Sequence, residues 1–402
     1  MSKTLVWMTN SFRADSRLTN NLSGDCAFVY YSPYHFAGDR EKQIYKSCSQ
    51  ANLDAFYSSI NSFSNMLHRA GTKLHVFRDN NVVQHINNLI DVHGFNQVVI
   101  DQPMFAMWHT VDVSLIKVPV NFIDSTLIDD TCIKLTAKSR WTSHIKNLSS
   151  FKPHKFSDQI IGYNIEPYLG HDYPVSEAPK LINVLEVIKH ALEIAPTYGE
   201  TRNQHDGQTR LSTALHNGVI DPSNIFFMLA KQFVKAGHDI SALDGPASSI
   251  LRQLAFREIS ILQTRRANMT LENTPLEWAR SLMHVDALNN LLNAKPNPSS
   301  TITFEKMAQA KTGDKDIDFL LTKIINTGIM PNRARMYFAS KMFYESASGL
   351  QALENSIDTF DLLGLDGQSP NNYTQCIGAY GLSYGKVLKM NRDRAFSMLG
   401  YE

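Results

Sequence analysis

The chain has 402 residues, of which 43% are hydrophobic and 19% charged, a composition that is typical of a soluble globular protein and excludes a disordered one. Its 39 Lys and Arg residues are balanced by 38 Asp and Glu residues, so any DNA-binding surface must be a local basic patch. Four scattered cysteines without a CxxC pair disfavour a disulfide framework and a metal or iron–sulfur site. We expect a cytoplasmic protein that does not span a membrane, because no apolar run is long enough for a signal peptide or a membrane span.

Residues 1–125 predict an α/β domain built on a parallel, Rossmann-like sheet. Residues 55–70 have the periodicity of an amphipathic helix that stops at Gly71. Strands that alternate with helices indicate a parallel sheet covered on both faces. Short apolar strands are expected at 4–8, 26–31, 74–77, 98–101 and 118–124.

Residues 126–180 predict a connector between two domains. Its segment 134–147 has a helical pattern, whereas 151–156 and 164–179 carry Pro and Gly and predict loops. From 181 to 402 the periodicity is helical throughout, which predicts an all-α domain. The expected helices are 181–194, 213–217, 223–236, 248–264, 276–292, 317–325, 333–346 and 356–363.

One stretch of this helical part, YGETRNQHDGQTRLSTALHNG from Tyr198 to Gly218, passes from a charged turn into an amphipathic helix. Gly207 frees the backbone at the junction, and Thr209 is a good helix-capping residue. The first helical turn would offer unpaired N–H groups beside a hydroxyl and the guanidinium of Arg210, which favours phosphate binding. An ordinary capped helix is the alternative.

Three further blocks follow in the chain. Taken alone, each block predicts a common structural feature. In chain order these features are a helix with an exposed ion pair, the start of a basic amphipathic helix, and a turn rich in Gly, Pro and Asn. They are SILRQLAFRE at 249–258, KTG at 311–313 followed by NTGIMPNRARM at 326–336, and LDGQSPNNYTQC at 365–376.

Together the four blocks resemble those of photolyases and cryptochromes, in the order and at the spacing of that family. The resemblance is strong over 198–222 and 326–336, moderate over 248–258 and 366–376, and weak before 180. It implies an α/β domain followed by an all-α domain that binds FAD noncovalently. The cofactor-binding residues that it implies are Tyr198, Gln208, Thr209, Arg210, Leu211, Ser212, Ile250, Gln253, Arg257, Asn332, Arg335, Asp366, Gln368 and Asn372.

The resemblance also implies roles around the flavin. Asn372 would face flavin N5, and with Gln253 and Phe256 it would form the catalytic set. DNA phosphates would be bound by Arg202 and Arg333, with Arg265 and Arg266 as further candidates. The segment 102–105 has no acidic residue of the kind that folate-binding members carry, which disfavours an antenna pigment.

The chain departs from the family pattern around the substrate pocket and along the electron route. Gln253 replaces a Glu that contacts the thymine dimer in many members, Phe256 and Ile250 replace Trp residues, and Gln368 replaces an Asp. The usual chain of three Trp residues is not visible. Cys376 and Met307 occupy two of its positions, no Trp follows Trp278, and Tyr373, Tyr380 and Tyr384 are alternative electron carriers.

By this resemblance, the leading hypothesis is repair of pyrimidine photoproducts in DNA under blue light, by electron transfer from reduced flavin to a flipped-out lesion. The alternative is a cryptochrome-like receptor that signals to a protein partner without repair, and a third is a flavoprotein with dark redox chemistry. We expect a monomer that binds lesion-containing DNA.

Overall fold

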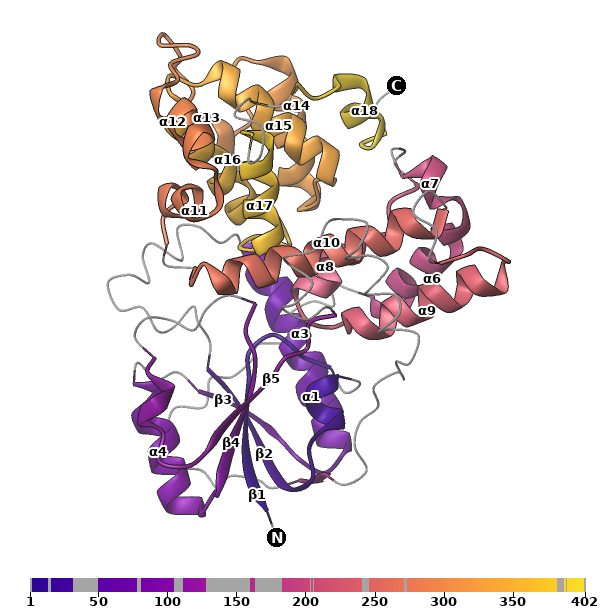
Figure 1. Cartoon of the computed structure of the whole chain (residues 1–402), viewed down its shortest axis with the longest axis vertical. Helices are drawn as coiled ribbons and strands as arrows, with labels where there is room; N and C mark the ends of the chain where they lie inside the picture. Colours follow the sequence, from indigo (N-terminus) through magenta and orange to yellow (C-terminus); the bar gives the residue numbers. More distant parts are fainter. Residues whose placement is uncertain are drawn as a thin grey trace.

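The computed structural model describes residues 2–13, 16–31, 50–77, 81–104, 111–127, 160–162, 183–202, 204, 206–240, 246–270, 273–381, 387 and 389–400. The predicted segments 134–147, 151–156 and 164–179 lie outside these residues, as does Tyr384. Figure 1 shows a twisted sheet with its helices in the lower half, a layer of helices across the middle, and a helix bundle above it. No helix in the described ranges combines the length and apolar character that crossing a membrane requires.

The sheet contains the five predicted strands, and all of them are parallel. They are β1 (Lys3–Met8), β2 (Gly24–Tyr31), β3 (Leu74–Phe77), β4 (Gln97–Asp101) and β5 (Val120–Ile123), in the order β3-β2-β1-β4-β5. A sixth strand, β6 (Ile160–Gly162), pairs in parallel with the start of β2, where no strand was predicted. The α/β character of this half is therefore confirmed.

Both faces of the sheet are covered, as the alternation of strands and helices predicts. The helices are α1 (Arg17–Asn20) and α3 (Gln50–Arg69), with α4 (Val82–His93) on the opposite side in Figure 1. Alternate residues of β1 face the two sides. Leu5 and Trp7 pack in the core that contains α4, whereas Val6 and Met8 pack in the core that contains α3.

The rest of the described chain is helical and forms two packed groups. The first group packs around a core that includes Tyr198, Phe226 and Leu251, and the second around one that includes Trp278, Phe338 and Phe360. The first comprises α6 (Val184–Ile194), α7 (Tyr198–Thr201), α8 (Leu211–His216), α9 (Pro222–Lys235) and α10 (Pro246–Arg266). The second comprises α11 (Pro275–Leu282), α12 (Val285–Asn293), α13 (Phe304–Ala308), α14 (Lys315–Thr327), α15 (Asn332–Glu345), α16 (Gly349–Leu363), α17 (Pro370–Ala379) and α18 (Arg392–Ser397).

The helix predicted at 276–292 is in fact two helices. Met283 ends α11 in an extended conformation, and the imidazole of His284 then accepts a hydrogen bond from the Asp286 amide and caps α12. The periodicity continues through the break, which explains why the pattern did not reveal it.

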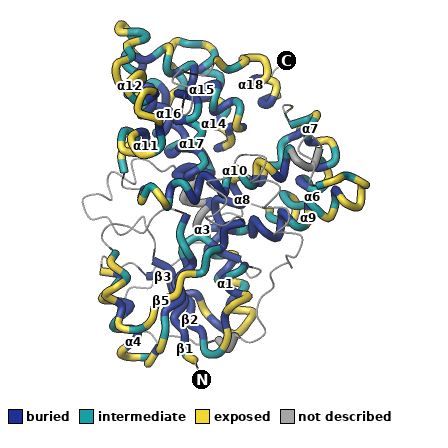
Figure 2. The backbone as a smooth tube through the Cα atoms, in the orientation of Figure 1, coloured by how far each residue is buried: buried dark blue, intermediate teal, exposed yellow. Residues whose placement is uncertain are grey.

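In Figure 2 the buried backbone of β1 and β2 continues upward through α8 and α10 to α17.

A buried ion pair joins the two halves. The Arg13 guanidinium, in the loop after β1, donates to Asp221 Oδ2 at 2.8 Å and to the Gly218 carbonyl at 2.9 Å. Both charged side chains are almost fully buried, at 6% and 1% exposure. Asp221 also caps α9 by accepting from the amides of Ser223 and Asn224. Removing either charge would leave the other buried and unpaired, so the pair fixes how the halves dock.

Gly218 allows the chain to come close at this interface. Its φ is +67°, and a Cβ built on it would lie 1.7 Å from the carbonyl oxygen of Asn10. Any other residue would therefore push the two halves apart.

We predict that Gly218→Ala destabilises the fold far more than Gly94→Ala. Both glycines have a left-handed backbone conformation, with φ of +67° at Gly218 and +70° at Gly94. A Cβ built on Gly94, however, meets no atom within 4 Å. Backbone strain alone costs about 1–2 kcal/mol, and the added clash should bring the loss at Gly218 to about 3 kcal/mol or more. Thermal unfolding of both variants measures the difference, and equal losses would contradict the tight contact with Asn10.

Candidate functional site

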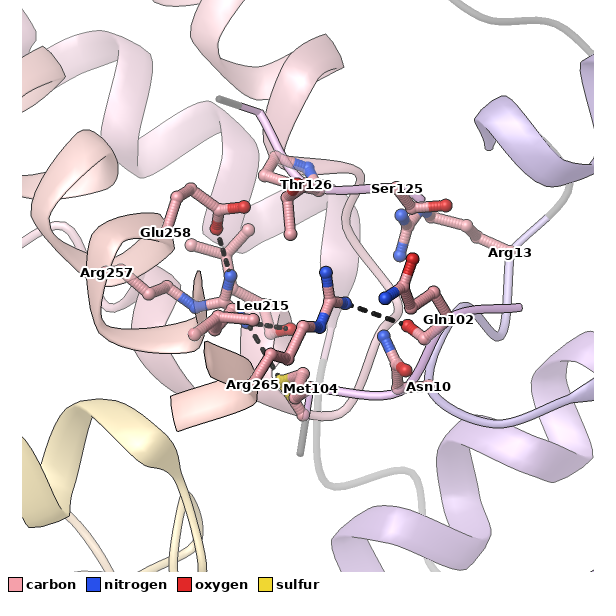
Figure 3. Close-up of a pocket in the computed structure, with 12 residues that line it drawn as sticks. Asn10, Arg13, Gln102, Met104, Ser125, Thr126, Leu215, Arg257, Glu258 and Arg265 are labelled. Carbon is pink, nitrogen blue, oxygen red and sulfur yellow. Dashed lines mark hydrogen bonds and ion pairs between the residues drawn. The ribbon is translucent and has the colours of Figure 1, made fainter. Parts of the chain in front are cut away.

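A small cavity lies between the two halves, at the carboxyl ends of β1 and β4 (Figure 3). The strand order reverses direction between these strands, which is where sheets of this kind often bind ligands. Its volume of about 20 Å³ has room for about one water molecule. The Arg265 guanidinium reaches into it and donates to the carbonyls of Gln102 and Pro103, at 3.0 and 2.6 Å, and to Asp124 at 3.0 Å. Arg265, considered above for a phosphate contact, thus holds the halves together.

A buried polar cluster forms where α15, α17 and the loop before α17 meet. Arg335 donates to Asp366 Oδ1 at 2.6 Å, to the Met330 carbonyl at 2.6 Å, and to the Asn372 amide oxygen. Asn372 in turn donates to the Asp366 carbonyl at 2.6 Å. The side chains of Arg335 and Asp366 are each only 5% exposed. Three of the predicted flavin residues, distant in sequence, are therefore hydrogen-bonded to one another.

His216 and Asn217, at the end of α8, lie near this cluster. The pKa of His216 is lowered to about 4, chiefly by burial; the charge of Asp366 opposes this lowering, and the positive charges of Arg257 and Arg335 add to it. The imidazole is therefore neutral at pH 7. His216 Nδ1 and Asn217 Oδ1 are buried and lack a hydrogen-bond partner among the described residues. These two atoms lie next to each other in the chain and beside the polar cluster, where a polar ligand would complete their hydrogen bonding.

Tyr198 and Gln253 form a second polar contact in the helical half. The Tyr198 hydroxyl donates to Gln253 Oε1 at 2.6 Å, and burial raises the pKa of Tyr198 to about 12. Gln253 and Phe256 are both exposed on α10, one turn apart, and 49% of Phe256 is accessible.

Two other predicted residues of α10 have structural contacts. Ile250 is 1% exposed and packs in the core of the α6–α10 group. Arg257 donates to the Leu215 carbonyl at 2.9 Å and pairs with Glu258, whose other oxygen accepts from the Leu127 amide at 2.9 Å. Arg257 thereby connects α10 to the end of α8.

The loop before α8 differs from its prediction. Arg210, not Thr209, occupies the capping position, with φ of +55°, and Thr209 Oγ1 only accepts from the Leu211 amide at 3.4 Å. The prediction that Thr209 caps the helix is therefore wrong. Arg210 and Ser212 are exposed, while the Gln208 side chain donates to the Met398 carbonyl and so connects this loop to the end of α18.

Three arginines from separate elements gather beside this loop. Burial lowers the pKa of Arg333, and the neighbouring positive charges of Arg202 and Arg394 lower it further. Arg202 ends α7, Arg333 lies in the first turn of α15, and Arg394 lies in α18. Figure 1 shows α7 and α18 on the same side of the molecule. We call these residues the arginine cluster. Sequence analysis missed Arg394, because nothing in its spacing connects it to the other two.

Comparisons with known proteins were made for the whole chain. No protein-family model matches it, and neither does any curated protein sequence. The crystal structure of a bacterial class III photolyase from Agrobacterium tumefaciens matches with a TM-score of 0.73 and 15% identity, covering 100% of this chain and 85% of that one. The cryptochrome of Synechocystis sp. PCC6803 matches with a TM-score of 0.71 and 16% identity, covering 100% of this chain and 86% of that one. This chain has the photolyase/cryptochrome fold.

The two residues that the resemblance placed at Trp positions, Cys376 and Met307, lie in a packed core. Cys376 and Met307 are buried at 1% and 0% exposure, in the same core as Trp278 and Tyr373. The rings of Trp278 and Tyr373 are in contact, with centroids 4.5 Å apart. Cys376 and Met307 thus share one core with a Trp–Tyr pair.

We predict that His216 makes the stability of the protein depend on pH between about 4 and 6.5. The unfolded chain binds a proton on His216 below its ordinary pKa of 6.5, whereas the folded chain resists protonation down to a pKa of about 4. The free energy of unfolding is therefore unaffected by His216 protonation above pH 6.5. It falls by on the order of 3 kcal/mol as pH decreases from 6.5 towards 4.

Chemical unfolding of wild type and His216→Gln at both ends of this range measures the effect. The free energy of unfolding of wild type, relative to the variant, should fall by that amount as pH decreases. A difference that does not change with pH would mean that His216 is not held neutral in the fold.

Proposed function

We propose that this chain binds FAD noncovalently in its helical half and repairs pyrimidine photoproducts in DNA under blue light. The observation that carries the proposal is the buried Arg335–Asp366–Asn372 cluster, with the unpartnered atoms of His216 and Asn217 beside it. A fold shared with a photolyase and a cryptochrome supports the FAD-binding part of the proposal.

These residues fit the group that the fold implies. The edge of a flavin ring carries hydrogen-bond donors and acceptors, and the cluster offers a cation, a carboxylate and an amide in a buried setting where such contacts are strong. His216 Nδ1 and Asn217 Oδ1 would gain the partners that they lack in the described chain. FAD, when bound and reduced, supplies the electron that splits the lesion, while the protein supplies binding and orientation.

The residues around the cluster have separate roles in this proposal. Arg335 holds Asn372 in place, so the Asn372 amide keeps one orientation towards the ring. Arg210 would contact the FAD diphosphate from the exposed start of α8. Phe256 and Gln253, exposed on α10, would receive the flipped-out lesion and exclude water from it.

The arginine cluster supports a DNA substrate. The positive charges of Arg202 and Arg394 act on Arg333 and add to the effect of burial in lowering its pKa, and a phosphate backbone would relieve that repulsion. The chain as a whole carries a net charge of only +1, so the attraction would be local and would position the duplex.

Signalling without repair is the second candidate. The replacement of the Trp chain by buried Cys376 and Met307 favours it, because photoreduction of the flavin is then less direct than in members that keep the chain. A signalling protein needs no lesion pocket, so DNA binding and repair assays separate the two functions.

We predict that the purified protein is yellow with FAD and that Arg210→Ala weakens the retention of FAD. A charge-assisted contact to a diphosphate contributes about 1.5–3 kcal/mol, so its loss should lower FAD affinity about tenfold or more. The matched control is Arg280→Ala, an exposed arginine on α11. Titration of apoprotein with FAD measures both variants. No flavin uptake by wild type would exclude the proposed function, and equal affinities would place Arg210 away from the diphosphate.

We predict that lesion-containing duplex DNA binds through the arginine cluster. Each of Arg202→Ala, Arg333→Ala and Arg394→Ala should reduce the slope of log affinity against log salt by about one unit, because each removes one phosphate contact. Arg280→Ala should leave the slope unchanged. Binding across a salt series, followed by a blue-light repair assay, tests both steps. A protein that binds FAD but neither binds nor repairs the lesion would support the signalling function instead.

A further inference from the structure

A tyrosine and an aspartate form a buried hydrogen bond close to the polar cluster. The Tyr373 hydroxyl on α17 donates to Asp361 Oδ2 on α16 at 2.6 Å, and Asp361 Oδ1 accepts from the Gln368 amide at 2.7 Å. The two side chains are buried, and a bond this short between a hydroxyl and a carboxyl oxygen is typical of a charged acceptor. Both oxygens of Asp361 are used as acceptors, as expected of a carboxylate.

The pair stands next to the residues proposed to hold the flavin. Tyr373 directly follows Asn372, and Gln368 belongs to the same loop as Asp366. Asp361 is close enough to Asp366 for the two charges to interact. Cys376 lies one helical turn after Tyr373. The charge of Arg335 lowers the pKa of its thiol, and the charge of Asp361 raises it. The pair therefore lies within one turn of α17 from the polar cluster.

A phenol gives up an electron readily only if its proton leaves at the same time, and in a buried site that proton needs a positioned base. Asp361 is such a base. Burial raises the pKa of Asp361 to about 7, with the charges of Asp358 and Asp366 adding to the effect, while the bonds from Tyr373 and Gln368 oppose it. A carboxylate of this basicity both accepts a proton and returns it near neutral pH.

We propose that Tyr373 and Asp361 act together as the proton-coupled electron donor that photoreduces the flavin, in place of the Trp chain. This inference rests on the proposed function, since it needs a bound flavin. When oxidised FAD is bound and excited by light, Tyr373 would give up one electron to it. The O–H bond of Tyr373 breaks, its proton forms a new O–H bond on Asp361 Oδ2, and a neutral tyrosyl radical remains. A thiol reductant in solution later returns the electron, and Asp361 returns the proton.

The chain contains a matched pair for comparison. Tyr337 on α15 donates to Asp316 Oδ2 at 2.7 Å, nearly the same distance. Arg392 also donates to Asp316, at 2.9 and 3.0 Å, and lowers the pKa of that carboxyl. Asp316 is therefore a weak base, and Tyr337 should not act as a donor.

The experiment uses the FAD-loaded protein, with flavin occupancy measured first by absorbance. Blue light should then produce the electron paramagnetic resonance signal of a neutral tyrosyl radical. Tyr373→Phe should abolish that signal and slow photoreduction by about a hundredfold, the effect expected when an essential proton transfer is lost. Tyr337→Phe should change neither. Asp361→Asn keeps an acceptor for the hydroxyl but not the base, so it should also suppress the radical.

Two further measurements separate proton transfer from packing. In wild type, radical formation should slow in heavy water and should increase as pH rises through about 7, where Asp361 becomes ionised. Among the described residues, the other titratable groups that interact with Asp361 are Tyr373, Asp358, Asp366 and Cys376, and all are retained in Asp361→Asn. Both dependences should therefore disappear in that variant.

Wild-type protein labelled with ring-deuterated tyrosine gives a test that needs no substitution, since the radical signal must narrow. A signal that does not narrow, or one that is lost in Trp278→Phe and kept in Tyr373→Phe, overturns the inference while the flavin remains bound. Wild type that takes up no flavin overturns the proposed function, and the inference with it.

Discussion

The buried guanidinium of Arg335 is the constraint on which the upper half of the molecule depends. It satisfies the Asp366 carboxylate, the Asn372 amide and the Met330 carbonyl at once, and so positions α15, α17 and the loop between α16 and α17. A charge this deeply buried is tolerated only when its partners are fixed. Each of these partners is therefore held in one place, and the region is suited to present polar groups to a ligand.

The Asp366 carboxylate of that ion pair also affects the pKa values of neighbouring residues. Asp366 lies near both His216 and Asp361, and its charge opposes the lowering of the His216 pKa and adds to the raising of the Asp361 pKa. Burial lowers the pKa of His216 and raises the pKa of Asp361, and both shifts favour the neutral form of the side chain. A neutral imidazole and a weakly acidic carboxyl therefore both lie within reach of the charge of Asp366.

Sequence patterns predicted the sheet well, because its strands are short apolar runs bounded by polar turns. They failed at β6 and at the break between α11 and α12. Three residues are too few to show a period, and the periodicity runs through Met283 and His284 without interruption. In both cases a tertiary contact or a single capping side chain decides the structure.

The candidate site was predicted only as far as its blocks could be recognised. Arg335, Asp366 and Asn372 are hydrogen-bonded to one another, which the sequence did not predict, while Ile250 packs in a core and Arg265 contacts the interface between the halves. Their predicted contacts with a flavin stay predictions. Arg394 and Asp361 were missed, because their importance comes from neighbours that are distant in the chain. No local pattern records such neighbours.

Strand β6 has a consequence for how the chain can be divided. Its pairing with Gly24–Cys26 means that the sheet receives its last strand only after residue 160 has been made, well beyond the fifth strand. A fragment that ends near residue 125 would leave part of the β2 edge without hydrogen bonds, and such open edges recruit other chains. During synthesis, the N-terminal half therefore reaches its finished sheet only when the segment after it has emerged from the ribosome.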